Sequence, residues 1–326
     1  MFSTDGYEAL GHGVALVSRT DRGVLRLSGA DRVRWLQGLV TNDVFALRPG
    51  HRLYSAWLTP QGRMIADLWV TAAPEALMLD VPAPLAPDLV ARLDRLVFAE
   101  DVRIDDVSVE LACTLVLGAG ASGAGGPVAG AGVLVPDDTY GRPGLVAYGN
   151  LDILLDAHGL GTLASAPRVD LDTFDVVRIE AGIPRFLADM TDDTIPLEAG
   201  IEDRAISFTK GCYVGQEIIV RVTTRGGGRV ARRLVGVTLE GPDRLNPGHD
   251  GASSPVAGAA LNIGARAVGR LTSVAWSPRL SRVIALGYVH RDFVDPGTRL
   301  EVRDGEQSLS AVVTALPFIA PVRAAS

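Results

Sequence analysis

The eight residues from Lys210 to Glu217, Lys-Gly-Cys-Tyr-Val-Gly-Gln-Glu, bring a thiol, an ammonium, a phenol, an amide and a carboxylate into one short stretch. Its two glycines permit turns, and the apolar run 218–220 follows directly. A glycine-rich polar stretch before β-branched residues predicts a tight loop that enters a buried strand. Loops fixed to rigid elements commonly carry binding and catalytic groups.

Lys210 is the only lysine of the chain, which otherwise uses arginine for its permanent positive charges. A position that keeps lysine indicates a need for a compact ammonium, which a planar guanidinium does not replace. Cys212 lies two residues away, and a neighbouring ammonium favours the nucleophilic thiolate. Cys212 and Lys210 are therefore the predicted catalytic residues. The alternative for Cys212 is a buried, inert thiol.

The octapeptide resembles the signature of the YgfZ family. These are folate-binding proteins of iron–sulfur cluster metabolism, related in fold to the aminomethyltransferase (T-protein) of the glycine cleavage system. Three further stretches are similar to family segments: SGADRVRWLQGLVTNDV at 28–44, LTPQGRMIADLWV at 58–70 and RIEAGIP at 178–184.

The resemblance implies an α+β fold whose ferredoxin-like lobes form a T-protein-like ring, followed by a C-terminal β-barrel. It implies tetrahydrofolate, or a one-carbon derivative, as the cofactor. The implied function is support of iron–sulfur cluster assembly or repair, with iron–sulfur proteins or cluster carriers as partners and a connection with tRNA modification.

Folate chemistry suggests which residues bind it. In the family the glutamate of the RIEAGIP stretch faces the folate, so Glu180 is expected to accept the neighbouring N–H groups of the pterin. Tyr213, or a tryptophan, would line an apolar slot for the rings, and Arg221 or Arg229 would bind the glutamate tail. The other predicted cofactor-binding residues are Gln216, Glu217 and Asn42. The alternatives are a solvated helix charge for Glu180 and a turn or cap for Asn42.

Two other functions are kept open. In T-proteins a catalytic aspartate near a helix start positions folate for aminomethyl transfer. The corresponding stretch here, 79–88, contains Asp80 and Asp88 but lacks the Asn- and Gly-rich surroundings of T-proteins. The third hypothesis is a non-catalytic adaptor that holds folate as a structural ligand.

Asp67, an acid in the apolar run 65–70, is either buried with partners or faces solvent.

Composition excludes several classes. A net charge of −7 over 326 residues argues against non-specific binding of nucleic acid. The N-terminus lacks a signal-peptide pattern, and no run of about twenty apolar residues predicts a membrane span, so we expect a cytoplasmic monomer. Cys113, in an apolar strand pattern, should be a small buried side chain. The cysteines and histidines show no metal-ligand pattern, so no resident metal is expected.

Hydrophobic patterning predicts the elements that position these groups. Helices are expected at 31–40, 84–98 and 170–182. Strands are expected at 14–17 and 24–27, joined as a hairpin, and at 51–58, 64–70, 76–81, 102–107, 111–117, 133–135, 145–148 and 153–155. The low-complexity stretches 118–132 and 248–260 read as loops.

The pattern changes after residue 230. Five β-patterned segments separated by turns predict a small barrel, at 233–239, 265–276, 282–290, 298–304 and 308–315. The predicted domains are a folate-binding α+β region at 1–230, with two intertwined lobes and a central cavity lined by 210–217, and a C-terminal barrel at 231–326.

Overall fold

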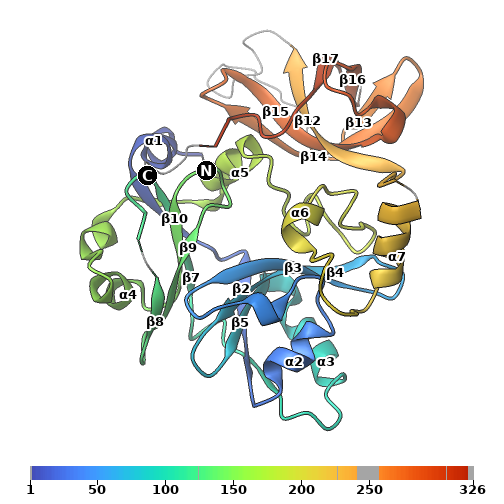
Figure 1. The fold of residues 1–326 in the computed structure, drawn as a ribbon. Helices are drawn as coiled ribbons and strands as arrows, with labels where there is room; N and C mark the ends of the chain where they lie inside the picture. The colour runs from blue at the N-terminus through green and yellow to red at the C-terminus, as the bar shows by residue number, and fades with distance from the viewer. Residues whose placement is uncertain (1, 124, 226, 241–256, 306, 322–326) are drawn as a thin grey trace. The chain divides into compact units, whose positions relative to one another are not determined.

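The computed structural model of the protein describes residues 2–123, 125–225, 227–240, 257–305 and 307–321 (Figure 1). They form two compact units. The first takes in the described residues of 1–174 and 202–218, and the second those of 175–201 and 219–321. Among these residues, no helix is long and apolar enough to cross a membrane. Most of the predicted loop 248–260 lies outside the described residues.

The first unit contains an antiparallel sheet that the sequence predicted well. Its order is β3 (Arg52–Leu58), β4 (Met64–Ala72), β5 (Leu77–Pro82), β2 (Arg22–Ser28) and β6 (Arg103–Asp106). The helices α2 (Arg32–Gln37) and α3 (Ala86–Asp94) lie against one face of it (Figure 1). Short 3-10 turns, η1 (Val44–Ala46) and η2 (Ala83–Leu85), follow α2 and precede α3. Apolar side chains of the sheet and both helices make one core, because each element has one apolar face to bury.

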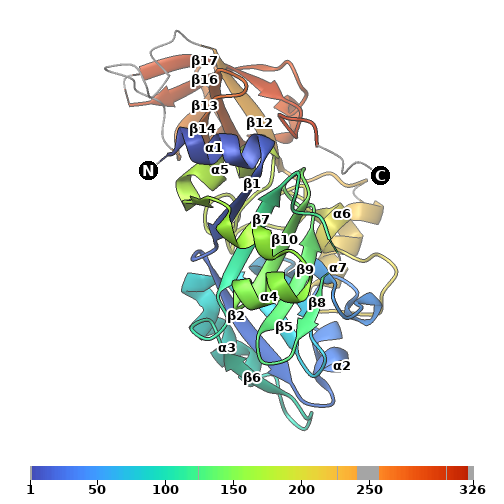
Figure 2. The ribbon, with the colours of Figure 1, turned by 90° about the vertical axis from the view of Figure 1, so that its left-hand side faces the viewer.

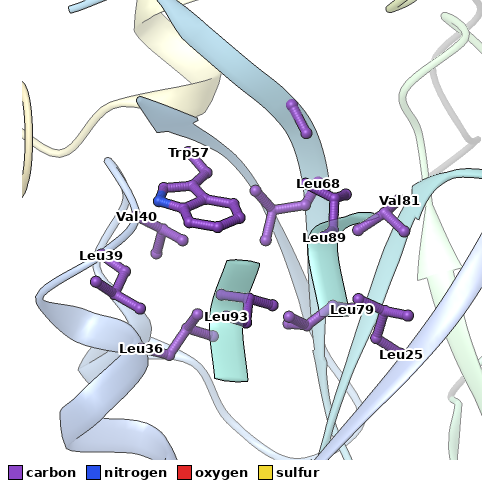
Figure 3. A pocket seen from close by; sticks show the side chains of 11 residues that line it. Leu25, Leu36, Leu39, Val40, Trp57, Leu68, Leu79, Val81, Leu89 and Leu93 are labelled. Atoms are coloured by element: carbon purple, nitrogen blue, oxygen red, sulfur yellow. The ribbon is translucent and has the colours of Figure 1, made fainter. Parts of the chain in front are cut away.

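A small void lies within this core, between the sheet and the two helices (Figure 3). Its volume is about 10 Å³, which is at the lower limit for one water molecule. Apolar side chains line it, including Leu36, Trp57 and Leu93. A void of this size and polarity is a packing gap rather than a folate site.

A second sheet of the first unit is mixed. Its order is β11 (Arg168–Val169), β1 (Val14–Ser18), β7 (Cys113–Gly118), β10 (Gly144–Gly149), β9 (Gly132–Asp137) and β8 (Gly126–Val128), with only the β1–β11 pair parallel among these strands. The helix α4 (Leu151–Ala157) lies over β9 and β10 (Figure 2), and the turn η3 (Gly161–Ser165) follows it. The N-terminal helix α1 (Thr4–His12) begins at Ser3, whose hydroxyl accepts from the Gly6 N–H.

Three local predictions are wrong. The strands β1 and β2 belong to different sheets, so the predicted hairpin does not form. The predicted strand 153–155 lies in α4, because Asn150 caps a helix by accepting from the Ile153 N–H. The predicted loop 118–132 contains β8 as an edge strand on β9.

A buried network of ion pairs in one sheet is linked by hydrogen bonding to the other sheet of the first unit. The Arg22 guanidinium donates to Asp67 at 2.8 Å and to Asp80 at 2.5 Å, and the three side chains are between 3% and 6% exposed. On the other sheet, the Tyr148 hydroxyl donates to Asp80 at 3.0 Å, and the Cys113 sulfur lies 3.8 Å from the same carboxylate. Asp67 is therefore buried with partners, and the alternative of a solvent-facing acid is wrong. Cys113 is buried, as predicted.

The second unit is built around a closed barrel, which confirms the predicted C-terminal β-barrel. Its described strands follow the order β12 (Arg232–Glu240), β15 (Arg282–His290), β14 (Arg266–Ser277), β13 (Ala260–Ile263), β16 (Arg299–Asp304) and β17 (Gln307–Thr314). A 3-10 turn, η6 (Arg291–Phe293), follows β15. Alternate residues of β12, β15, β16 and β17 fill the interior with aliphatic side chains. The α+β fold class is confirmed, while the predicted domain boundary at residue 230 stays a prediction.

The helix α5 (Leu171–Glu180) ends within the second unit, where an ion pair and hydrogen bonds link it to the barrel strand β14. The Arg178 guanidinium donates to the carboxylate of Asp189 at 2.7 Å and to the Ser273 hydroxyl of β14 at 2.9 Å. The Asp189 carboxylate also accepts from the hydroxyls of Thr272 and Ser273. These contacts position the last turn of α5, where Glu180 lies.

Candidate functional site

The octapeptide 210–217 leads into a helix, not a strand. The helix α7 (Gln216–Val220) contains the apolar run, and a π-helical turn, η4 (Arg221–Arg225), continues it. The hydroxyls of Thr223 and Thr224 donate back to the Ile219 and Val220 carbonyls. The predicted buried strand at 218–220 is therefore wrong, because a short apolar run fits a helix as well as a strand.

Lys210 has well-defined partners. Its Nζ donates to the backbone carbonyls of Gln37 (2.6 Å), Val40 (2.7 Å) and Asn42 (2.9 Å). An ammonium has three N–H groups, so these carbonyls use all of them. Burial lowers the pKa of Lys210 to about 8, and the nearby carboxylate of Asp43 acts in the opposite direction. The predicted electrostatic effect of Lys210 on Cys212 would therefore act without a direct hydrogen bond.

The residues around these carbonyls are held by their own hydrogen bonds. The Asn42 amide donates to the carbonyls of Tyr54 (2.8 Å) and Arg204 (2.9 Å), and its carbonyl Oδ1 accepts from the Asp43 N–H. The Thr41 hydroxyl donates to the Ala205 carbonyl at 2.6 Å. Arg204 and Ala205 belong to the short helix α6 (Glu202–Ala205). Asn42 thus links two other segments of the backbone, whereas the residue that caps the following turn η1 is Asp43. The binding role of Asn42 stays a prediction.

Tyr213 and Gly215 fix the other half of the octapeptide. The Tyr213 side chain is buried, its ring centroid lies 5.3 Å from Lys210 Nζ, and burial raises its pKa to about 12. Gly215 has φ +85°, and a Cβ there would lie 2.6 Å from the Thr59 carbonyl oxygen of the β3–β4 turn. The Val214 N–H donates to the Gly38 carbonyl at 3.3 Å. These positions therefore anchor the loop to the sheet of the first unit.

Cys212 is exposed, unlike the side chains of Lys210 and Tyr213 on either side of it. Lys210 and Tyr213 are buried, Gln216 is half-buried, and Glu217 is exposed in the first turn of α7. The loop therefore holds a solvent-accessible thiol on a backbone that is tied down on both sides. Such a thiol can act as a nucleophile or bind a soft partner. The alternative of a buried, inert Cys212 is wrong.

Glu180 is buried at the end of α5, with 1% of its surface exposed. Its Oε1 accepts from the Ser277 hydroxyl of β14 at 2.5 Å, and its backbone carbonyl accepts from the Ile319 N–H at 3.2 Å. A solvated helix charge, the alternative for this residue, is therefore wrong. Arg221 and Arg229 are exposed.

The structure thus brings together Lys210, Tyr213 and Asn42 in the first unit, whereas Glu180 and Arg221 belong to the second. Sequence reasoning missed Gln37, whose buried amide donates to Asp43 and accepts from the Val44 N–H. The available signal in the sequence was a glutamine near the end of a predicted helix, within the stretch 28–44 that resembles the family. In the described part of the chain, no group of three or more His, Cys, Asp or Glu side chains could hold a metal ion.

The domain comparison defines the class of protein. Residues 2–124 match the GCVT N-terminal domain, and residues 232–319 match the glycine cleavage T-protein C-terminal barrel domain. The crystal structure of the glycine cleavage system aminomethyltransferase T from Bartonella henselae has the same fold. Its TM-score is 0.81 at 19% identity, over 97% of this chain and 89% of that one. The chain therefore carries both T-protein domain types on a T-protein-like fold.

Relatives of the chain include proteins named for two different functions. The chain is 32% identical to the mitochondrial iron–sulfur cluster assembly factor IBA57 homolog of Mycosarcoma maydis, over 66% of this chain and 54% of that protein. The match thus spans about half the length of that relative. The chain is also 27% identical to the aminomethyltransferase of Nostoc sp., over 97% of this chain and 87% of the enzyme.

Proposed function

We propose that this protein binds a reduced folate and supports iron–sulfur cluster assembly or repair through Cys212. The observation that carries the proposal is an exposed thiol on a loop whose neighbouring groups are anchored. The relationship to an iron–sulfur cluster assembly factor supports the same function. We further propose iron–sulfur proteins or cluster carriers as partners, and the protein as a cytoplasmic monomer.

The residues at the end of α5 fit a reduced folate. A buried carboxylate can accept the adjacent N–H groups of a pterin together, and Glu180 is such a carboxylate, oriented by Ser277. When bound, tetrahydrofolate would supply a carrier for one-carbon units. Tyr213, Gln216, Glu217 and Asn42 stay candidates for the ring contacts and Arg221 for the tail. The predicted cavity along 210–217 stays a prediction too.

Replacing Glu180 by alanine should weaken the binding of tetrahydrofolate about tenfold or more. Removing a charged hydrogen-bond partner of a buried group costs about 1.5–3 kcal/mol. Isothermal titration calorimetry under reducing conditions measures the change. Glu75→Ala, which removes an exposed carboxylate from the β4–β5 turn, is the matched control and should bind as the unaltered protein does. Equal affinity of Glu180→Ala and the control would refute the role of Glu180.

Aminomethyl transfer is the second candidate function. It is favoured by the similarity to an aminomethyltransferase over 97% of this chain. Of the two acids in the stretch 79–88, Asp80 is buried against Arg22, whereas Asp88 lies exposed in the first turn of α3. An assay for folate-dependent release of ammonia from an aminomethylated carrier decides between the two functions. A pulldown of cluster carriers with and without folate tests the adaptor hypothesis.

A further inference from the structure

The carbonyls that bind Lys210 form a cage with one centre. Gln37 is the last residue of α2, where backbone carbonyls lack helical partners. Val40 and Asn42 follow in the connection to η1, and their carbonyls converge on the same nitrogen, with N···O distances between 2.6 and 2.9 Å. The helix dipole also favours a cation at this end of α2.

We propose that Lys210 is a positioning residue whose ammonium fills a cation site made by the Gln37, Val40 and Asn42 carbonyls and thereby fixes the loop that carries Cys212. The site would accept a small, hydrogen-bonding monovalent cation of the ammonium type if the lysine side chain were removed. The importance of this positioning rests on the proposed function of Cys212, but the cation site itself does not.

The cage is held independently of Lys210. The side chain of Gln37 is bonded to Asp43 and to the Val44 N–H, Thr41 is bonded to Ala205, and Asn42 is bonded to Tyr54 and Arg204. Val40 also pairs with Trp57 of β3. Truncation of Lys210 should therefore leave the carbonyls close to their present positions, ready for another cation.

Geometry explains why this position holds the only lysine of a chain rich in arginine. The three N–H groups of an ammonium diverge from one atom and can reach three carbonyls that surround it. The donors of a guanidinium are spread over a planar fork, which suits a carboxylate rather than a compact cage. Lys210→Arg should therefore keep the positive charge but not bind all three carbonyls.

The test uses the full chain with Lys210→Ala and compares its melting temperature and hydrogen exchange in different chloride salts at equal ionic strength. Exchange of the peptide 206–217 reports on loop docking, because the Val214 N–H donates to the Gly38 carbonyl. In sodium chloride we expect a lower melting temperature and exchange faster by about tenfold or more, as expected for losing one net charged hydrogen bond. Ammonium or propylammonium should restore both. Tetramethylammonium, which has no N–H group, should not.

Two further variants separate the cage from a simple charge effect. Lys210→Arg should show the same faster exchange as Lys210→Ala. If Lys210 acted only through its charge on the thiolate, the exchange of Lys210→Arg would instead be close to that of the unaltered protein. In Lys210→Ala combined with Cys212→Ser, ammonium should still restore the melting temperature. If Lys210→Ala does not fold in sodium chloride, folding of this variant in ammonium or propylammonium chloride supports the proposal in the same way. The proposal would be overturned if no ammonium salt changed the melting temperature or hydrogen exchange of Lys210→Ala, or if Lys210→Arg exchanged as slowly as the unaltered protein. Neither result would contradict the proposed function.

Discussion

Replacing Arg22 by methionine is expected to lower the free energy of unfolding by about 3–5 kcal/mol, the usual cost of removing one partner from a buried ion pair. Arg22 donates to two buried carboxylates, Asp67 and Asp80. Each retains a hydroxyl donor, from Tyr54 and Tyr148 respectively, but each loses its direct ion pair with Arg22. Methionine preserves apolar volume, so the loss reports on charge rather than on a cavity.

Urea denaturation followed by circular dichroism measures this change, provided that the slope with urea stays constant. The matched control is Arg92→Met, which removes an exposed partner of Asp88 on α3. Exposed pairs contribute at most about 1 kcal/mol. A loss for Arg22→Met no larger than that of the control would show that these buried ion pairs do not stabilise the fold.

Cys212 should react with iodoacetamide at least about a thousandfold faster than Cys113 in the native protein. Cys113 is buried, and burial together with the Asp80 carboxylate raises its pKa. It can react only when the protein opens, and the open fraction of a stable protein is about 10⁻³ or less. Cys212 is exposed and needs no opening.

Peptide mass spectrometry over a labelling time course gives both rates in a single sample. In urea above the unfolding midpoint the two rates should converge, since both thiols are then exposed. This convergence is the control for intrinsic differences between the two peptides. Comparable native rates would mean that Cys212 is protected or that Cys113 is accessible, and either result contradicts the structure.

The sequence predicted most strands because their apolar residues alternate or run together, and those of the barrel are separated by clear turns. It failed where a short apolar run is ambiguous, as at 153–155 and 218–220, both of which are helical. At the first of these, the capping residue Asn150 and the helical spacing of Leu151, Leu154 and Leu155 outweigh the apolar run. Chain order alone also could not show that β1 and β2 pair with different, distant strands.

The candidate site was predicted in part. The octapeptide drew attention to Lys210 and Cys212, and their contrast in burial was visible only in the structure. The partners of the Lys210 ammonium are backbone carbonyls about 170 residues away in the chain, which no side-chain pattern reveals. The burial of Glu180 likewise depends on a barrel strand that follows it by almost one hundred residues.

The central claim, that the protein supports iron–sulfur enzymes through the Cys212 thiol, is tested most directly by complementation. A strain lacking this protein is given the unaltered chain, Cys212→Ser or Cys113→Ser, and the activity of a cluster-dependent enzyme is measured at equal protein levels. Serine keeps the size of the side chain but does not ionise at neutral pH. Cys212→Ser should therefore fold, bind folate and fail to restore activity, whereas Cys113→Ser should restore it in proportion to its folded level. Full restoration by Cys212→Ser would contradict the claim.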